Sequence, residues 1–222
     1  MSRQKTQRFE DNSKRYNVLE PGKPLYETIK GQWNAVQFKN DFPITLELGC
    51  GNGEYTIGLG STFSNRNYIG IDIKGERIWV GSGIAEERLL PNVAFLRTQM
   101  QFLPNFFEQG EVDEIWLTFP DPRPKERDEK RRLSCPAYMQ LYRSALRKNG
   151  WFRFKTDNSF LFDYTLEKIG NDEVAVKNLT YTHDLYQSGL LAEHHGIQTK
   201  YEKRFSELGE TIKYMKFQFN ED

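Results

Sequence analysis

The chain has 222 residues, of which 31 are lysine or arginine and 31 are aspartate or glutamate, so its formal net charge at pH 7 is zero. This balance excludes a generic polycation, and the length slightly favours one domain over two. The first thirty residues contain no apolar signal segment, and no stretch approaches the length that a membrane span needs. We therefore expect a cytoplasmic protein that does not bind membranes.

Basic residues nevertheless gather in three stretches of the chain. They are Arg3, Lys5, Arg8, Lys14 and Arg15 in an N-terminal arm; Arg123, Lys125, Arg127, Lys130, Arg131 and Arg132 in a segment that we call the basic ribbon (residues 123–132); and Arg143, Arg147 and Lys148 after it. On a helix, Arg143 and Arg147 share one face because they are four residues apart. Charge runs are often only solvated surface, so the residues beside them decide whether they predict an anionic partner.

The sequence gives no sign of a metal centre or a disulfide framework. Cys50 and Cys135 lie far apart and form no Cys-x-x-Cys pattern, so we expect both to be packing residues. The three histidines lack the spacing of metal ligands, and we expect His194 and His195 to lie in a solvated loop.

For residues 1–40 we predict a basic arm followed by a helix near residues 24–39, and for residues 41–222 a single domain. Helix-length stretches separate successive β-rich runs in this domain. These runs are residues 44–50, 67–73, 93–98, 112–119 and 150–156.

The end of the chain predicts how the sheet is completed. Ser134 is a credible N-cap, Pro136 fits a first helical turn and Gly150 fits a helix end, so a helix is expected between them. Residues 173–182 and 211–219 read as two strands with no long helix between them, which is typical of an antiparallel hairpin. The whole pattern predicts an α/β fold with a mostly parallel, seven-stranded sheet covered on both faces.

The turn after the first predicted strand is rich in glycine and reads ELGCGNGEY. Gly49, Gly51 and Gly53 permit tight turning and a close approach of the backbone to a ligand. Counted from Gly49, the last glycine comes one residue too early for the G-x-G-x-x-G pattern of dinucleotide-binding proteins. With Glu47 ahead of it, the pattern is E-x-G-x-G-x-G, which resembles motif I of the class I S-adenosylmethionine-dependent methyltransferases.

The next two turns offer polar side chains where an open α/β sheet binds its ligands. Asp72 ends the second run, where a carboxylate accepts hydrogen bonds from ribose hydroxyls; the alternative is a cap at the next helix. Gln99 follows the third run, where its amide would face an adenine edge.

The fourth turn reads LTFPDPRPKERDEKRR and carries the most specific signal. Prolines on both sides of Asp121 fix the backbone dihedrals and remove amide donors, so this carboxylate is held rigidly. Together with E-x-G-x-G-x-G before it and TDN and TKYE after it, the turn resembles the tRNA (guanine-N7-)-methyltransferase family, over about residues 44 to 219. Arg123 departs from the family pattern, which has tryptophan there.

The resemblance implies a Rossmann-like class I methyltransferase fold and a site for S-adenosylmethionine. It places cofactor contacts at Glu47, Asp72, Gln99 and Asp121, next to the glycine loop of Gly49, Gly51 and Gly53. It places substrate contacts at Lys125, Asp157, Thr199, Lys200, Tyr201 and Glu202. The partner that it implies is tRNA, and the product is 7-methylguanosine in its variable loop; the protein would be a monomer or a homodimer without a metal.

The chemistry of the reaction assigns roles to these residues. Guanine N7 carries a lone pair and no proton, so its methylation needs no general base, and a carboxylate at Asp121 would stabilise the positive charge that appears on the purine. Glu202 or Asp157 would accept hydrogen bonds from N1 and the 2-amino group, unless Glu202 only caps a helix. Arg127, Arg131 and Arg132, with Arg143 and Arg147, are expected to contact phosphates, and Phe119 and Tyr201 to stack on a base.

Other functions remain open from the sequence. F-P-D-P is similar to the turn of exocyclic-amine methyltransferases, although Arg123 stands where those have an aromatic residue. A cofactor-binding RNA module without catalysis would also have these features. A small-molecule methyltransferase would have little use for basic clusters beside its pocket.

Overall fold

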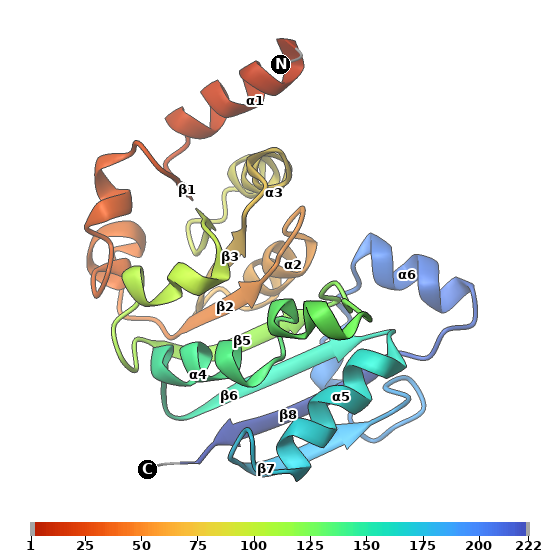
Figure 1. Ribbon diagram of the computed structural model, residues 1–222. Coiled ribbons are helices and arrows are strands. Elements are labelled where there is room, and N and C mark those ends of the chain that lie inside the picture. The colour runs from red at the N-terminus through yellow and green to blue at the C-terminus, as the bar shows by residue number, and fades with distance from the viewer. Residues whose placement is uncertain (1–2, 221–222) are drawn as a thin grey trace.

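The structure of the protein is a computed structural model that describes residues 3–220, and for residues 3–5 it describes the backbone only. The side chains of Arg3 and Lys5, which we assigned to the basic arm, therefore lie outside the described part. Eight strands form one sheet in the order β1-β4-β3-β2-β5-β6-β8-β7 (Figure 1). Their bounds are Val18–Leu19 (β1), Ile44–Leu48 (β2), Asn67–Asp72 (β3), Val93–Arg97 (β4), Val112–Thr118 (β5), Leu146–Thr156 (β6), Val176–Thr182 (β7) and Lys213–Phe219 (β8).

The direction of the strands agrees with the predicted fold class. β1 to β6 pair in parallel, whereas β8 pairs antiparallel with β6 and with β7. The mostly parallel sheet and its C-terminal hairpin are thus confirmed, while the expected number of seven strands is too low. The extra strand is β1, two residues that pair with β4 and are too short to leave a hydrophobic pattern.

Helices cover both faces of this sheet (Figure 1). One face packs against α4 (Pro136–Ala145) and α5 (Ser159–Gly170), and the other packs against α2 (Glu54–Thr62) and α3 (Gly75–Glu87). α1 (Arg3–Lys14) packs on α3, and α6 (Lys200–Glu207) lies in the connection between β7 and β8. The remaining helical turns are η1 (Pro24–Glu27), η2 (Trp33–Phe38), η3 (Met100–Asn105), η4 (Glu126–Arg131) and η5 (Leu191–His194).

The helix expected near residues 24–39 is wrong as one element. The segment instead forms the short turns η1 and η2 with Gly31 between them, at a φ of 71°. The amide of Gly31 donates to Glu111 Oε2 over 3.0 Å, and a Cβ at this position would meet the Glu108 carboxyl carbon at 2.7 Å. Residues 1–40 also supply β1 and the fully buried Trp33 to the domain; the division at residue 40 stays a prediction.

The helix expected to end at Gly150 is also shorter than predicted. α4 ends at Ala145, and β6 begins at the next residue, so Gly150 lies within the strand. A Cβ at Gly150 would meet the carbonyl oxygen of Asp113 at 2.9 Å, which explains the glycine without a helix end. Pro136 does stand in the first turn, but Ser134 is no cap: its buried hydroxyl accepts a hydrogen bond from Thr165 over 2.8 Å.

The order of the strands positions the functional site. β2 lies between β3 and β5, so the direction in which the chain moves across the sheet reverses at β2. Ligands of open α/β folds bind at such a reversal, beyond the carboxyl ends of the strands. The glycine loop follows β2 and the F-P-D-P turn follows β5, and these two strands are hydrogen-bonded neighbours.

Candidate active site

The glycine loop turns sharply at the end of β2. Gly49, Gly51 and Gly53 have φ values of 69°, 57° and 72°, which L-residues with a side chain rarely adopt. Gly53 is the most constrained, because a Cβ there would lie 2.5 Å from a ring carbon of Phe95. The amide of Gly51 donates to Asp72 Oδ2 over 3.0 Å, so the loop is tied to the end of β3.

Glu47 lies buried at the end of β2 and receives hydrogen bonds from two threonines. Thr118 Oγ1 donates to Glu47 Oε1 over 2.7 Å, and the amide of Thr56 donates to Oε2 over 2.8 Å; the Thr56 hydroxyl donates to Oε2 as well. Burial raises the pKa of Glu47 above its ordinary value, although these donors act in the opposite direction. The carboxylate is thereby fixed beside the start of α2.

Two adjoining cavities open at the carboxyl edge of the sheet. The larger, of about 770 Å³, is lined by Asp72, which ends β3, and by Gln99 and Asp121, which follow β4 and β5. The smaller, of about 320 Å³, is lined by Glu47, Gly49, Gly51, Thr199, Lys200 and Tyr201. Four residues line both cavities, namely Gly49, Arg77, Phe119 and Tyr201. The glycine loop therefore faces the F-P-D-P turn that carries Asp121.

Asp121 stands in a turn whose backbone is held in an uncommon conformation. Phe119 and Arg123 have positive φ values of 47° and 46°, which cost free energy in residues with a side chain. Arg132 Nε donates to the carbonyl oxygen of Arg123 over 3.1 Å and so holds the far end of the turn. The Asp121 side chain is 66% exposed, and its Oδ2 pairs with Arg123 Nε over 3.0 Å.

The start of α6 forms the opposite wall. Thr199 is its N-cap and accepts a hydrogen bond from the amide of Glu202 over 3.0 Å, while the Lys200 amide donates to Glu54 Oε2 over 2.7 Å. These contacts place the centroid of the Tyr201 ring 5.4 Å from the centroid of the Phe119 ring. The Tyr201 hydroxyl donates to Asp157 Oδ2 over 3.4 Å.

Glu202 does not face the cavities. Its side chain is fully buried and pairs with Lys155 Nζ over 2.8 Å, while His194 Nε2 lies 3.1 Å from its other oxygen. The interpretation of Glu202 as the acceptor that reads guanine therefore disagrees with the structure. The expectation that His194 lies in a solvated loop is wrong for the same reason, because this histidine is buried against Glu202.

Arg132 is buried as well, which contradicts its expected contact with phosphates. Its guanidinium lies over the rings of Phe160 and Tyr164, at 4.8 and 4.4 Å from their centroids. Lys125 and Arg127 are exposed but line neither cavity, and Arg131 lines the larger one. The basic ribbon thus divides into buried and exposed cations.

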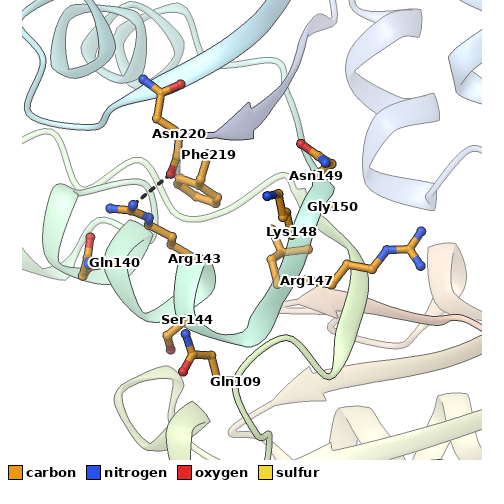
Figure 2. Close-up of a pocket in the computed structure, with 11 residues that line it drawn as sticks. Gln109, Gln140, Arg143, Ser144, Arg147, Lys148, Asn149, Gly150, Phe219 and Asn220 are labelled. Atoms are coloured by element: carbon orange, nitrogen blue, oxygen red, sulfur yellow. Dashed lines mark hydrogen bonds between the residues drawn. The ribbon is translucent and has the colours of Figure 1, made fainter. Parts of the chain in front are cut away.

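The last basic group lies at the opposite end of the sheet. Arg147 is on β6 rather than on the helix that carries Arg143, so the expected common helix face does not exist. Both arginines line a cavity of about 380 Å³ near the start of β6 (Figure 2). Arg147 pairs with Asp113 over 2.5 Å, and Arg143 donates to the carbonyl oxygen of Asn220 over 2.8 Å.

Several residues that line or support the cavities are marked by no motif in the sequence. Arg77 lines both cavities from α3, where no motif marks it. Thr56 and Thr118 hold Glu47, and the only hint was the threonine directly before F-P-D-P. Lys155, which precedes the TDN motif, is fully buried.

No group of three or more histidine, cysteine, aspartate or glutamate side chains among residues 3–220 is placed to hold a metal ion. Cys50 and Cys135 are both free and buried, as packing residues are. None of the described helices has the length and apolar character to cross a membrane.

Comparison with solved structures identifies the fold. The 16S rRNA methyltransferase KamB superposes with a TM-score of 0.62 at 12% sequence identity, covering 86% of this chain and 94% of that one. The 16S rRNA (adenine(1408)-N(1))-methyltransferase from Catenulisporales acidiphilia gives a TM-score of 0.61 at 13% identity, with 86% and 93% covered. Both show a class I methyltransferase fold.

Sequence comparison identifies the family. Residues 41–215 match the model of a family described as putative methyltransferase. The tRNA (guanine-N(7)-)-methyltransferase of Cytophaga hutchinsonii is 51% identical over 99% of both chains, and that of Bacteroides fragilis is 42% identical over 98% of this chain and 86% of its own. The chain belongs to the tRNA (guanine-N(7)-)-methyltransferase family.

Proposed function

We propose that this protein transfers the methyl group of S-adenosylmethionine to N7 of a guanine in tRNA and so forms 7-methylguanosine. The observation that carries the proposal is the meeting of the glycine loop with Asp121 across two adjoining cavities. The names of the relatives supply the substrate and the position of the methyl group. A guanine in the variable loop remains the expected target.

The residues around the two cavities fit the chemistry of the cofactor, which supplies an electrophilic methyl group when it is bound. Each oxygen of the Asp72 carboxylate accepts one backbone hydrogen bond, from Gly51 at 3.0 Å and from Lys74 at 2.8 Å. A carboxylate oxygen has two lone pairs, so capacity remains for the ribose hydroxyls. The glycine loop and Glu47 would hold the amino-acid part, and Gln99 would face the base.

Asp121 is the proposed catalytic residue. Positive charge moves from sulfur to the purine during the reaction, and a fixed carboxylate beside the purine lowers the energy of that change. The rings of Phe119 and Tyr201 contact each other and line both cavities, so they would together form a surface on which the guanine stacks with its N7 directed at the methyl group. Asp157 lines neither cavity, but it is half-buried and accepts a hydrogen bond from Tyr201, so it stays the candidate for reading the base.

The exposed part of the basic ribbon would receive the RNA backbone. Lys125, Arg127 and Arg131 are solvent-exposed and follow the catalytic turn directly. Their contacts with phosphates would fix the register of the tRNA without reading its sequence. Lys200, 91% exposed at the start of α6, would contact it from the other wall.

One experiment tests the proposal. The protein is incubated with labelled S-adenosylmethionine and unmodified tRNA, the RNA is digested to nucleosides, and the label is expected in 7-methylguanosine. Label in an exocyclic N-methylguanosine would instead identify an exocyclic-amine methyltransferase. Binding of S-adenosylmethionine without any transfer would identify a non-catalytic module.

The oligomeric state needs a second measurement. The same preparation, analysed by size-exclusion chromatography with light scattering, tests the predicted monomer or homodimer. Cytoplasmic localisation also remains a prediction.

A further inference from the structure

A buried charged pair connects α6 to the sheet. Lys155 and Glu202 are both fully buried, and Lys155 Nζ lies 2.8 Å from Glu202 Oε2. Taking two charges out of water costs several kcal/mol, so such a pair is weak evidence for stability, and apolar residues of similar volume are often as stable. Stability alone therefore does not explain why a charged pair occupies this buried position.

The second oxygen of Glu202 is held just as firmly. Tyr186 donates its hydroxyl to Glu202 Oε1 over 3.0 Å, and His194 Nε2 lies 3.1 Å from the same atom. Both residues belong to the connector, which we define as residues 183–212 between β7 and β8. Glu202 is consequently the point at which this connector is joined to Lys155 on β6.

Lys155 also contacts the other parts of the active site. Its carbonyl oxygen accepts a hydrogen bond from the amide of Phe119, the first residue of the F-P-D-P turn, over 2.8 Å. Its ammonium group lies 4.5 Å from the centroid of the Tyr55 ring, next to the glycine loop, and 5.6 Å from that of Phe119. Burial lowers the pKa of Lys155, while the negative charges of Glu202 and Glu47 act against this shift.

We propose that Lys155 is a positioning residue for methyl transfer: its buried ammonium group fixes the start of α6 through Glu202 and thereby holds Tyr201 opposite Phe119. Tyr201 directly precedes Glu202 on α6, so a shift of the Glu202 side chain moves the aromatic wall of the site. The proposal rests on the function proposed above and changes the role of Glu202 from substrate contact to anchor.

A double-mutant cycle tests it with Lys155→Met, Glu202→Met and the double variant. Lys155→Met alone leaves a buried carboxylate without its cation and lowers Tm, whereas the double variant leaves no unpaired buried charge and regains Tm. We expect both single variants and the double variant to lose kcat to the same extent, at least about tenfold at saturating S-adenosylmethionine and tRNA. Equal, non-additive losses are what one shared anchor produces.

A readout independent of activity accompanies the cycle. Hydrogen exchange of the α6 amides should be faster in the double variant, while the α5 amides exchange as in the wild type. If the wild type itself forms no 7-methylguanosine, the proposed function fails, but the exchange of α6 still tests the anchor.

Lys216→Met is the matched control. Lys216 pairs with Glu193 over 2.6 Å and so joins the same connector to β8, away from the cavities. This variant should keep kcat within about twofold of the wild type and leave the exchange of α6 unchanged. The proposal is overturned if the control loses kcat equally, if the double variant regains kcat together with Tm, or if Lys155→Met keeps kcat while Glu202→Met loses it.

Discussion

Asp121 combines a rigid backbone with an accessible carboxylate, which is the combination that electrostatic catalysis needs. The turn is set by two residues with positive φ and by the prolines, while two thirds of the side chain, 66%, stays exposed. We expect Asp121→Asn to lower kcat by about 100-fold or more, the scale on which one fixed electrostatic group contributes. Single-turnover kinetics at saturating S-adenosylmethionine measure this, and a wild-type rate would contradict the catalytic role.

Arg123 forms an ion pair with Asp121 and so partly neutralises it. The ion pair is exposed, with side-chain accessibilities of 35% and 66%, so separating it costs at most about 1 kcal/mol. Arg123→Gln should therefore leave Tm almost unchanged and raise kcat/KM up to about fivefold, because the carboxylate is then unpaired before the substrate arrives. Steady-state kinetics on tRNA measure the change. The same substitution made on Asp121→Asn should give no gain, and a gain there would show that Arg123 acts elsewhere.

Most of the predicted site residues that line the two cavities belong to a local motif. The glycines after β2 and the prolines around Asp121 restrict the backbone locally, so a short stretch reveals them. Glu202 and Arg132 were misassigned because their burial depends on partners far along the chain. Glu202 meets Lys155 across 47 residues, and no local spacing announces such a contact.

The N-cap of α6 determines how one wall of the site begins. Thr199→Ala removes the acceptor for the Glu202 amide and should cost about 1 kcal/mol of stability. Fraying of this first turn also loosens Tyr201, so we expect a several-fold lower kcat/KM for tRNA. Ile169→Val in α5 removes one methyl group at a similar cost and serves as the control. Equal losses of activity in the two variants would attribute the effect to stability alone.

The strands were more predictable than the helical segments for a physical reason. A buried parallel strand is a short, continuous apolar run, so residues 44–50, 67–73, 93–98 and 112–119 closely match β2 to β5. Residues 24–39 have helical composition, but packing against Glu108 and Glu111 bends the chain at Gly31. Tertiary contacts of this kind override local propensity and leave no pattern in the sequence.

The distribution of charge over the surface matters more for RNA binding than the net charge of zero. The cations of the basic ribbon lie beside the cavities at the carboxyl edge of the sheet, whereas Arg147 lies near the start of β6 at the opposite end. We therefore expect an RNA that reaches Asp121 to approach the first group and not Arg147. Removing a cation from the basic ribbon should therefore weaken tRNA binding, whereas removing Arg147 should not.

Salt dependence of tRNA binding measures this asymmetry. Each phosphate contact contributes about 0.7 to 0.9 to the slope of log affinity against log salt concentration. Arg127→Gln should therefore reduce the slope by about that amount, since Arg127 is exposed on the ribbon. Arg147→Gln removes a cation that is 57% exposed and should leave the slope unchanged. Filter binding across a range of salt concentrations gives both slopes. Equal reductions would mean that the RNA extends to the amino end of the sheet, and an unchanged slope for Arg127→Gln would remove this arginine from the interface.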